Sequence, residues 1–125
     1  MTTILAVGPH PDDVEGGMGG SILKLISLGY DVHILDLTNG EPTPHGSPEI
    51  RQKEWEQASF MLGIKSRTVL DLPNRYLLDN IEARKKVAAV IRKIKPQILF
   101  LPYWIDAHPD HVQTTQISEA ARFYA

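Results

Sequence analysis

The hydrophobic positions of the chain form four short runs, separated by longer stretches in which apolar residues recur with a different period. The runs cover residues 4–7, 32–37, 68–70 and 97–101. Short, mainly apolar runs of this kind are typical of parallel strands that are buried on both faces. The sequence therefore predicts four strands.

Between these runs, apolar residues return every three or four positions, which is the period of a helix with one buried side. The residues that share a side are Val14, Met18, Ile22, Leu25 and Ile26; Ile50, Glu54, Ala58, Met61 and Leu62; and Ala83, Val87, Val90, Ile91 and Ile94. Ser47 followed by Pro48 marks one helix start and Asn80 another, while Gly29 and Gly63 are helix stops. Three helices are predicted from these patterns.

The alternation of strands and helices predicts an α/β fold, a Rossmann-like three-layer α/β/α sandwich with a mainly parallel sheet. With the strand order 3-2-1-4, the first and fourth strands are neighbours and the winding reverses between them. Ligands of such sheets bind at the carboxyl ends of the strands beside this reversal. The length of 125 residues suits one domain, which we place at residues 1–125.

Two similar motifs follow the two strands beside the reversal. His10-Pro11-Asp12-Asp13 comes after the first strand, and His108-Pro109-Asp110-His111 comes after the fourth. Imidazoles and a carboxylate with one position left for water are a common catalytic zinc arrangement, and they also suit non-haem iron(II). The sequence thus predicts a divalent-metal site in which water becomes a nucleophile at neutral pH.

The candidate ligands are His10, Asp13 and His111. Adjacent carboxylates cannot both point at one spot, so Asp13 is predicted to bind the metal and Asp12 to accept a proton from water. In the second motif, His108 could remain protonated and stabilise an oxyanion or protonate a leaving amine.

Asp110 could orient an imidazole, as carboxylates behind metal ligands do, and could also cap a fourth helix starting near His111. Each motif also has a plain structural interpretation, because Pro and Asp mark turns and Asp is a common helix N-cap. The functional hypothesis rests on two such motifs at the predicted reversal.

A glycine cluster, Gly16, Gly17, Gly19 and Gly20, raises the alternative of dinucleotide binding. The dinucleotide fingerprint needs glycines at i, i+2 and i+5, and Ile22 occupies the last position when counting starts at Gly17. We expect these glycines to let a helix pack close to the sheet instead.

Composition narrows the class of protein further. The net charge of −2 argues against a nucleic-acid surface, and the absence of cysteine excludes disulfides and thiolate metal sites. No apolar run approaches the ~18–20 residues of a membrane helix, and the N-terminus lacks a secretory pattern. We therefore expect a cytoplasmic protein without nucleic-acid or membrane partners.

Together with Thr38-Asn39-Gly40-Glu41 and Pro48-Glu49-Ile50-Arg51, the two motifs resemble the LmbE/PIG-L family of metal-dependent N-acetylglucosaminyl deacetylases. The resemblance covers nearly the whole chain. It looks closest to the bacterial branch that deacetylates N-acetylglucosaminyl-malate in bacillithiol synthesis, although Asn39 stands where that branch often has arginine.

The resemblance implies roles for the residues of both motifs. It makes His10, Asp13 and His111 zinc ligands and Asp12 the base. It implies that His108 assists the tetrahedral intermediate and that Asp110 tunes His108. It implies that Arg51 and Glu41 bind the substrate.

The implied reaction is zinc-dependent removal of an acetyl group from an N-acetyl sugar, with Fe²⁺ or another divalent metal as alternatives to Zn²⁺. Family members usually continue beyond the second motif, so we expect either a homo-oligomer or a partner that supplies the missing C-terminal part. Without that part, the fourth strand is expected to form an exposed apolar edge. The rival hypotheses are hydrolysis of another amide or of a phosphoester, a non-catalytic metal- or sugar-binding half-domain, and an iron oxygenase.

Overall fold

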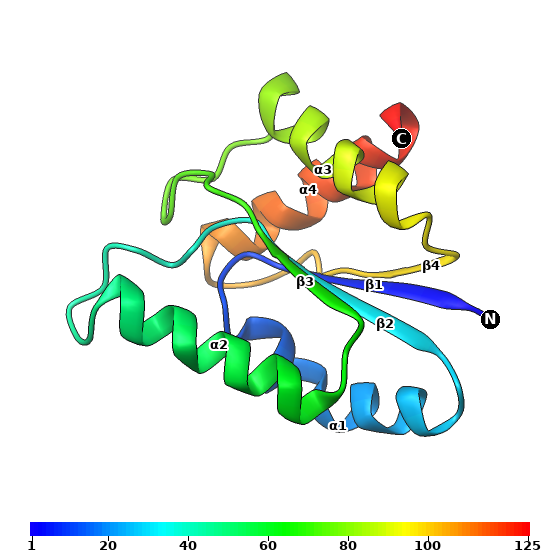
Figure 1. Ribbon diagram of the computed structural model, residues 1–125. Helices are drawn as coiled ribbons and strands as arrows, with labels where there is room; N and C mark the ends of the chain where they lie inside the picture. Colours follow the sequence, from blue (N-terminus) through cyan, green and yellow to red (C-terminus); the bar gives the residue numbers. More distant parts are fainter.

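The structure, a computed structural model, describes residues 1–125 as a parallel sheet between two layers of helices (Figure 1). The strands are β1 (Thr3–Gly8), β2 (Asp31–Asp36), β3 (Ser66–Val69) and β4 (Ile98–Phe100). The helices are α1 (Asp13–Ser27), α2 (Pro48–Leu62), α3 (Ile81–Ile94) and α4 (Pro109–Tyr124). The strand order is β3-β2-β1-β4 with all neighbours parallel, which confirms the predicted class and order.

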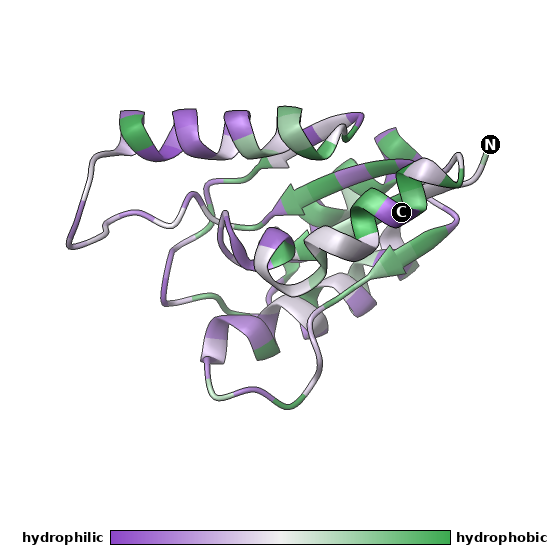
Figure 2. Ribbon diagram, turned by 90° about the horizontal axis from the view of Figure 1, so that it is seen from below, coloured by the Kyte–Doolittle hydropathy of each residue, from purple (hydrophilic) through white to green (hydrophobic).

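The two central strands are buried on both faces. Leu5 and Leu35 pack with Val87 of α3 on one face, while Ile4 and Ile34 pack with the α1 side on the other. Figure 2 shows the resulting band of hydrophobic strands between more polar helices. Burying each such side chain contributes roughly 1.5–3 kcal/mol, which explains why β1 and β2 form the rigid centre of the sheet.

The predicted helix starts at Ser47 and Asn80 are confirmed. The Ser47 Oγ accepts a hydrogen bond from the backbone N–H of Ile50 at 3.2 Å, and the Asn80 Oδ1 accepts one from Ala83 at 2.9 Å. These side chains satisfy N–H groups that have no partner within the first turn of a helix. At the other end of α2, Gly63 has a φ of 78°, the left-handed conformation that ends many helices.

The predicted cap of the last helix is wrong. Helix α4 begins at Pro109, and His108 is its N-cap, since the ring Nδ1 of His108 accepts a hydrogen bond from the backbone N–H of Asp110 at 3.1 Å. The Asp110 carboxylate is completely buried and points away from this helix end. It contacts His10 Nε2 instead, at the site that is described below.

The expected role of the glycine cluster in α1 is also wrong. A Cβ atom added at any of its four glycines would meet no atom within 4 Å, so none of them permits a close approach. The close contact between helix and sheet lies at Gly8, where a Cβ would stand 3.0 Å from Val14 Cγ2. Within the cluster, Met18 leaves helical geometry (φ −145°, ψ 22°) and kinks α1.

Helix α2 and strand β4 are the least buried elements. No residue of α2 is fully buried, and Ile50 and Met61, which were placed on one side with Ala58 and Leu62, are 52% and 73% exposed. Strand β4 pairs with β1 alone, which leaves Ile98 and Phe100 40% and 39% exposed at the sheet edge. None of the helices combines the length and apolar character needed to cross a membrane.

Candidate metal centre

The sheet brings the two His-Pro-Asp motifs together at the carboxyl ends of β1 and β4. His10 Nε2 lies 2.8 Å from Asp110 Oδ2, although the two residues are 100 positions apart. The ring of His10 lies 5.0 Å from that of His108 and 6.0 Å from that of His111, measured between centroids. Three imidazoles thus converge where the winding of the sheet reverses, as the sequence predicted.

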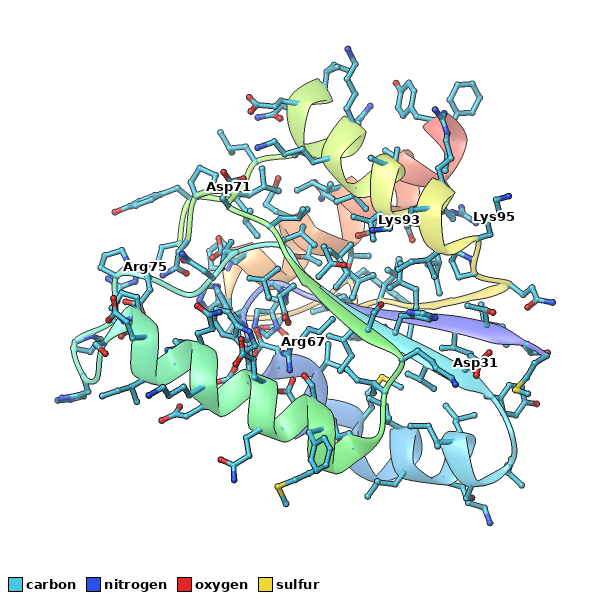
Figure 3. The ribbon with its side chains drawn as sticks, viewed as in Figure 1. Asp31, Arg67, Asp71, Arg75, Lys93 and Lys95 are labelled. Carbon is cyan, nitrogen blue, oxygen red and sulfur yellow. The ribbon has the colours of Figure 1, made fainter.

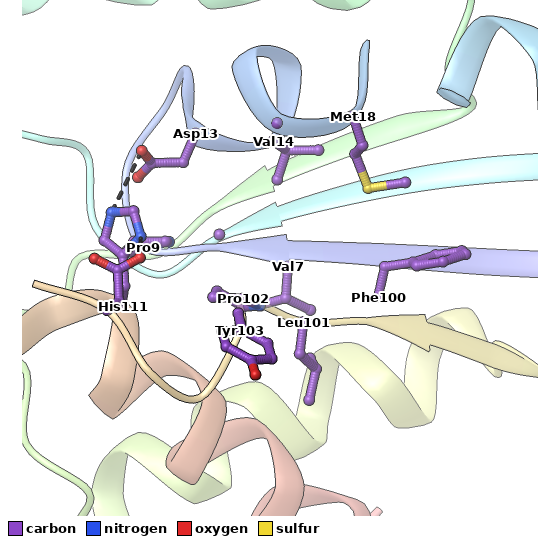
Figure 4. A pocket seen from close by; sticks show the side chains of 13 residues that line it. Val7, Pro9, Asp13, Val14, Met18, Phe100, Leu101, Pro102, Tyr103 and His111 are labelled. Carbon is purple, nitrogen blue, oxygen red and sulfur yellow. Dashed lines mark ion pairs between the residues drawn. The ribbon is translucent and has the colours of Figure 1, made fainter. Parts of the chain in front are cut away.

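His10, Asp13 and His111 form the arrangement that best fits a metal ion. Their candidate ligand atoms all lie within 4.8 Å of one another. The two oxygens of Asp13 face different histidines, since Oδ2 lies 3.0 Å from His10 Nδ1 and Oδ1 lies 3.5 Å from His111 Nε2. Figure 4 shows Asp13 and His111 facing each other. Ligand atoms about 2.0–2.2 Å from a tetrahedral Zn²⁺ stand roughly 3.3–3.5 Å apart, so the donors and their spacing suit a divalent cation.

A second group, His10, His108 and Asp110, is equally compact. Its carboxylate, however, is already engaged by the backbone, because Asp110 accepts hydrogen bonds from the N–H groups of Arg75 at 2.7 Å and Leu77 at 3.1 Å. A carboxylate that is turned toward two backbone donors is poorly placed to ligate a cation. The first group is therefore the better candidate for the metal ligands.

The charges of the first group also suit a cation. Burial raises the pKa of Asp13, but the contacts with His10 and His111 outweigh burial and lower it overall, so the carboxylate is ionised. Burial lowers the pKa of His10, but hydrogen bonds to Asp13 and Asp110 outweigh it and raise the pKa overall. Carboxylates thus surround His10, and a bound cation would replace the proton that they favour.

Each ligand imidazole has a carboxylate behind it. Asp110 contacts His10 Nε2, and Asp106 Oδ2 lies 3.1 Å from His111 Nδ1. A carboxylate on the far nitrogen fixes the tautomer and orientation of a ligand imidazole. The predicted orienting role of Asp110 thus falls on His10, whereas its carboxylate makes no hydrogen bond to His108. Asp106 was not predicted; the only signal in the sequence is an acid two residues before the second motif.

A hydrogen bond at the start of α4 involves one of the two ring nitrogens of His108. Because Nδ1 accepts from the N–H of Asp110, Nε2 is the ring nitrogen that is left to donate a hydrogen bond. The predicted role of His108 in stabilising an oxyanion or protonating a leaving amine stays a prediction. The Nε2–H remains a hydrogen-bond donor.

Asp12 stands at the start of α1 in an unusual conformation. Its φ of 114° is a strained backbone angle for a residue with a side chain, and its carboxylate makes no capping hydrogen bond. The side chain is 77% exposed, and its Oδ2 lies 3.8 Å from Arg51 Nη2. Partial burial and the neighbouring Asp13 raise the pKa of Asp12, while Arg51 opposes them.

Contacts from Thr38, in the loop after β2, and from Arg51, in α2, hold the turn that carries Asp12. The buried Thr38 donates from Oγ1 to the carbonyl of Pro9 at 2.9 Å, and Arg51 Nη2 donates to the carbonyl of Pro11 at 3.2 Å. The guanidinium of Arg51 lies over Gly40, where a Cβ would be 3.0 Å from it. Thr38 and Gly40 were therefore missed as structural parts of the site, although both lie in the Thr38-Asn39-Gly40-Glu41 segment.

The two predicted substrate-binding residues are Arg51, which contacts this turn, and Glu41, which lies in the loop after β2. Arg51 Nε and Glu41 Oε1 are buried without a hydrogen-bond partner, which is costly unless a further group binds there. The other Glu41 oxygen, Oε2, accepts from the N–H of Thr43 at 3.1 Å. Glu41 thus belongs to the loop rather than to the cluster of metal ligands.

A hollow of about 360 Å³ opens next to the candidate ligands (Figure 4). Asp13 and His111 line its polar end, and apolar side chains that include Val14, Met18 and Phe100 line the remainder. The hollow lies between α1 and the free edge of β4. A small molecule could therefore reach the candidate metal ligands from this side.

The chain belongs to the PIG-L family, described as GlcNAc-PI de-N-acetylase, which it matches over residues 5–122. It is 37% identical over 118 residues to the diacetylchitobiose deacetylase of Thermococcus kodakarensis, an alignment that covers 86% of this chain and 44% of that protein. It is 30% identical over 122 residues to a probable N-acetyl-α-D-glucosaminyl L-malate deacetylase of Bacillus cereus, covering 86% and 55%.

Among solved structures, a conserved protein of Thermus thermophilus superposes with a TM-score of 0.92 and 41% identity, over 97% of this chain and 55% of that one. The chain thus spans about half the length of the relatives that it matches. These comparisons confirm the family that the sequence resembles.

Proposed function

We propose that this chain carries the metal-binding half of an N-acetyl-sugar deacetylase, which hydrolyses the acetamide of a substrate containing N-acetylglucosamine. One observation supports this most strongly. His10, Asp13 and His111 form a compact two-imidazole, one-carboxylate set, and the next residue in the chain to Asp13 is Asp12, whose carboxylate is not used for capping. The relatives named as deacetylases favour an acetylated amino sugar over other amides.

We propose Zn²⁺ as the cation, because two histidines and one carboxylate are a frequent catalytic zinc set. When bound, a divalent cation lowers the pKa of water and polarises a carbonyl. Side chains of this chain transfer the proton, stabilise the developing negative charge and bind the sugar.

Asp12 is the general base in this proposal. Its carboxylate is exposed and is not used for helix capping, and its one ion pair is the 3.8 Å contact between Oδ2 and Arg51 Nη2, so it can accept a proton from water. The same group then returns the proton to the nitrogen of the departing amine. His108 donates its Nε2–H to the oxygen on which negative charge develops, because its Nδ1 is occupied by the Asp110 N–H.

Arg51 and Glu41 bind the sugar in this proposal. Both carry a buried polar atom without a partner in the protein, and sugar hydroxyls can donate to the Glu41 oxygen and accept from the Arg51 N–H. Arg51 lies beside Asp12, so a sugar bound to it would place its acetamide close to the base and the metal ligands.

The experiment that tests this function measures metal uptake and acetate release on the same metal-stripped protein. We expect one equivalent of Zn²⁺ to bind and to restore acetate release from N-acetylglucosaminyl-malate or diacetylchitobiose. A matched sample of His111→Ala should bind Zn²⁺ at least 100-fold more weakly.

Failure of the wild-type chain to bind Zn²⁺ would overturn the metal site. Stoichiometric binding without acetate release from either sugar would instead overturn the hydrolytic role and favour a non-catalytic metal-binding half-domain. Release from an unrelated amide or a phosphoester, but from neither sugar, would overturn the substrate class.

A further inference from the structure

A buried cluster of charged residues lies outside the candidate metal ligands, below the first turn of α1. Arg67 of β3 is only 5% exposed and contacts Asp36 of β2, which is fully buried, and Glu15 of α1, which is 20% exposed. Figure 3 places Arg67 between β3 and the two helices α1 and α2. None of these three residues takes part in the chemistry described above.

The guanidinium of Arg67 uses all of its hydrogen-bonding capacity. Its Nε and Nη2 donate to the Asp36 carboxylate at 2.6 and 3.1 Å, and its Nη1 and Nη2 donate to the Glu15 carboxylate at 2.9 Å each. A fifth contact joins Nη1 to Ser59 Oγ of α2 at 3.4 Å. Two forked pairs fix direction as well as distance, which a single ammonium group cannot do.

This cluster connects the element that carries the base to the centre of the sheet. Glu15 lies two residues after Asp13 and three after Asp12, in the first turn of α1. Asp36 is the last residue of β2 and pairs with Gly8, the last residue of β1. Through Arg67, the first turn of α1 is therefore tied to the rigid strands from which His10 also follows.

The first turn of α1 needs such an anchor because its own cap does not supply one. The Asp12 side chain makes no capping hydrogen bond, and its backbone is in the strained left-handed region. Helix starts without a side-chain cap are less stable by about 0.5–2 kcal/mol and are free to fray. Fraying here would move both Asp12 and Asp13.

We propose that Glu15, Arg67 and Asp36 are positioning residues for the metal centre, which hold the first turn of α1 so that Asp13 meets His10 and His111. This inference rests on the proposed metal-binding function. Buried ion pairs often add little to the free energy of unfolding compared with apolar side chains of similar volume, so the direction that the forked pairs fix is the better reason for a charged cluster here. The cluster fixes the orientation of the turn that carries Asp12 and Asp13.

The test compares two substitutions, Arg67→Lys and Glu15→Gln, with the control Arg84→Lys. Arg84 makes a similar forked pair with Asp79, at 2.7 and 2.8 Å, but it belongs to α3 on the other face of the sheet. Co²⁺ is the probe, since its visible absorption reports ligand geometry in the absence of substrate. Thermal unfolding of each variant is measured alongside.

Lys at position 67 keeps the positive charge but cannot hold two carboxylates in forked pairs. We therefore expect Arg67→Lys and Glu15→Gln to bind Co²⁺ about 10–100-fold more weakly, the usual effect of changes behind metal ligands, and to alter its absorption spectrum. Arg84→Lys should bind within about twofold of the wild type, because no metal ligand depends on its pair.

Wild-type Co²⁺ affinity and spectrum in folded Arg67→Lys and Glu15→Gln would overturn the positioning role and leave the cluster purely structural. If Arg67→Lys does not fold, the more exposed Glu15→Gln decides the question alone. Failure of the wild-type chain to bind Co²⁺ and Zn²⁺ would instead count against the proposed function.

Discussion

The starts of α1 and α3 have similar sequence signals but different structures. At α3, Asn80 has extended backbone geometry and its side chain caps the helix by accepting from the N–H of Ala83. At α1, Asp12 has left-handed geometry, and its side chain caps nothing. Asn and Asp are both strong N-cap residues, so local preference alone does not explain the difference.

This difference at Asp12 is what its proposed role as general base would require. An Asp12 carboxylate that capped its own helix would point at the backbone N–H groups and would not be free to accept a proton from water. Strained backbone and unused caps tend to cluster at functional positions, where the surrounding structure holds them. Here Thr38 and Arg51 hold the turn by donating to the carbonyls of Pro9 and Pro11.

The largest effect that tests this comparison is expected from Asp12. Asp12→Asn should lower acetate release about 10²–10⁴-fold, the usual contribution of a general base, and leave Zn²⁺ affinity within about threefold. Asp12→Gly should lose the same activity but should not lose stability, because glycine relieves strain of about 1–3 kcal/mol at this φ. Acetate release, zinc titration and urea unfolding measure the three quantities.

The conservative exchange Asp12→Glu serves as a control, since it keeps a carboxylate in a displaced position and should retain part of the activity. Near-normal turnover in Asp12→Asn would show that another group accepts the proton. A marked loss of stability in Asp12→Gly would show that the left-handed backbone carries no strain and would remove the contrast with Asn80.

The sequence predicted the parts of this molecule that depend on local pattern. Short apolar runs and helical periodicity gave the strands and helices, and the rule for parallel α/β sheets placed His10 and Asp110 in one crevice. The structure bears this out with a 2.8 Å contact between their side chains. The capping signals at Ser47 and Asn80 were equally local and were correct.

The remaining features depend on contacts between distant residues, which no local pattern encodes. Arg67 and Glu15 are 52 positions apart, and neither belongs to a motif that the sequence analysis singled out. The cap of α4 was misassigned because His108 competes with Asp110 for that position, and the buried Asp110 carboxylate binds distant N–H groups instead. The periodicity of α2 predicted the helix correctly but not a buried side, because no residue of this helix is fully buried.

A smaller effect is expected from Asp110, which supports the site without touching the proposed metal. Asp110→Asn should weaken Zn²⁺ affinity about 10–100-fold, since an amide orients the His10 ring less well than a carboxylate does. The protein should also lose stability, because Asp110 accepts two backbone hydrogen bonds from the 75–77 segment. Competition with a fluorescent zinc chelator measures the affinity.

Asp106→Asn is the matched comparison, because Asp106 stands behind His111 as Asp110 stands behind His10 but is 33% exposed. We expect a weaker decrease in affinity there, since solvent screens an exposed carboxylate. Equal Zn²⁺ affinity in the wild type and Asp110→Asn would mean that the 2.8 Å contact does not orient the ligand.

The smallest effect concerns the cap that serves stability alone. Asn80→Ala should lower the free energy of unfolding by about 1 kcal/mol, the usual cost of removing a side-chain cap, because the N–H of Ala83 loses its partner. Ser47→Ala should cost a similar amount at the start of α2. Neither side chain contacts the candidate ligands, so Zn²⁺ affinity should stay within about twofold of the wild type, measured beside urea unfolding curves. A loss of zinc affinity in Asn80→Ala as large as that in Asp110→Asn would contradict this expectation. The start of α1 at Asp12 would then not differ in function from the starts of α2 and α3.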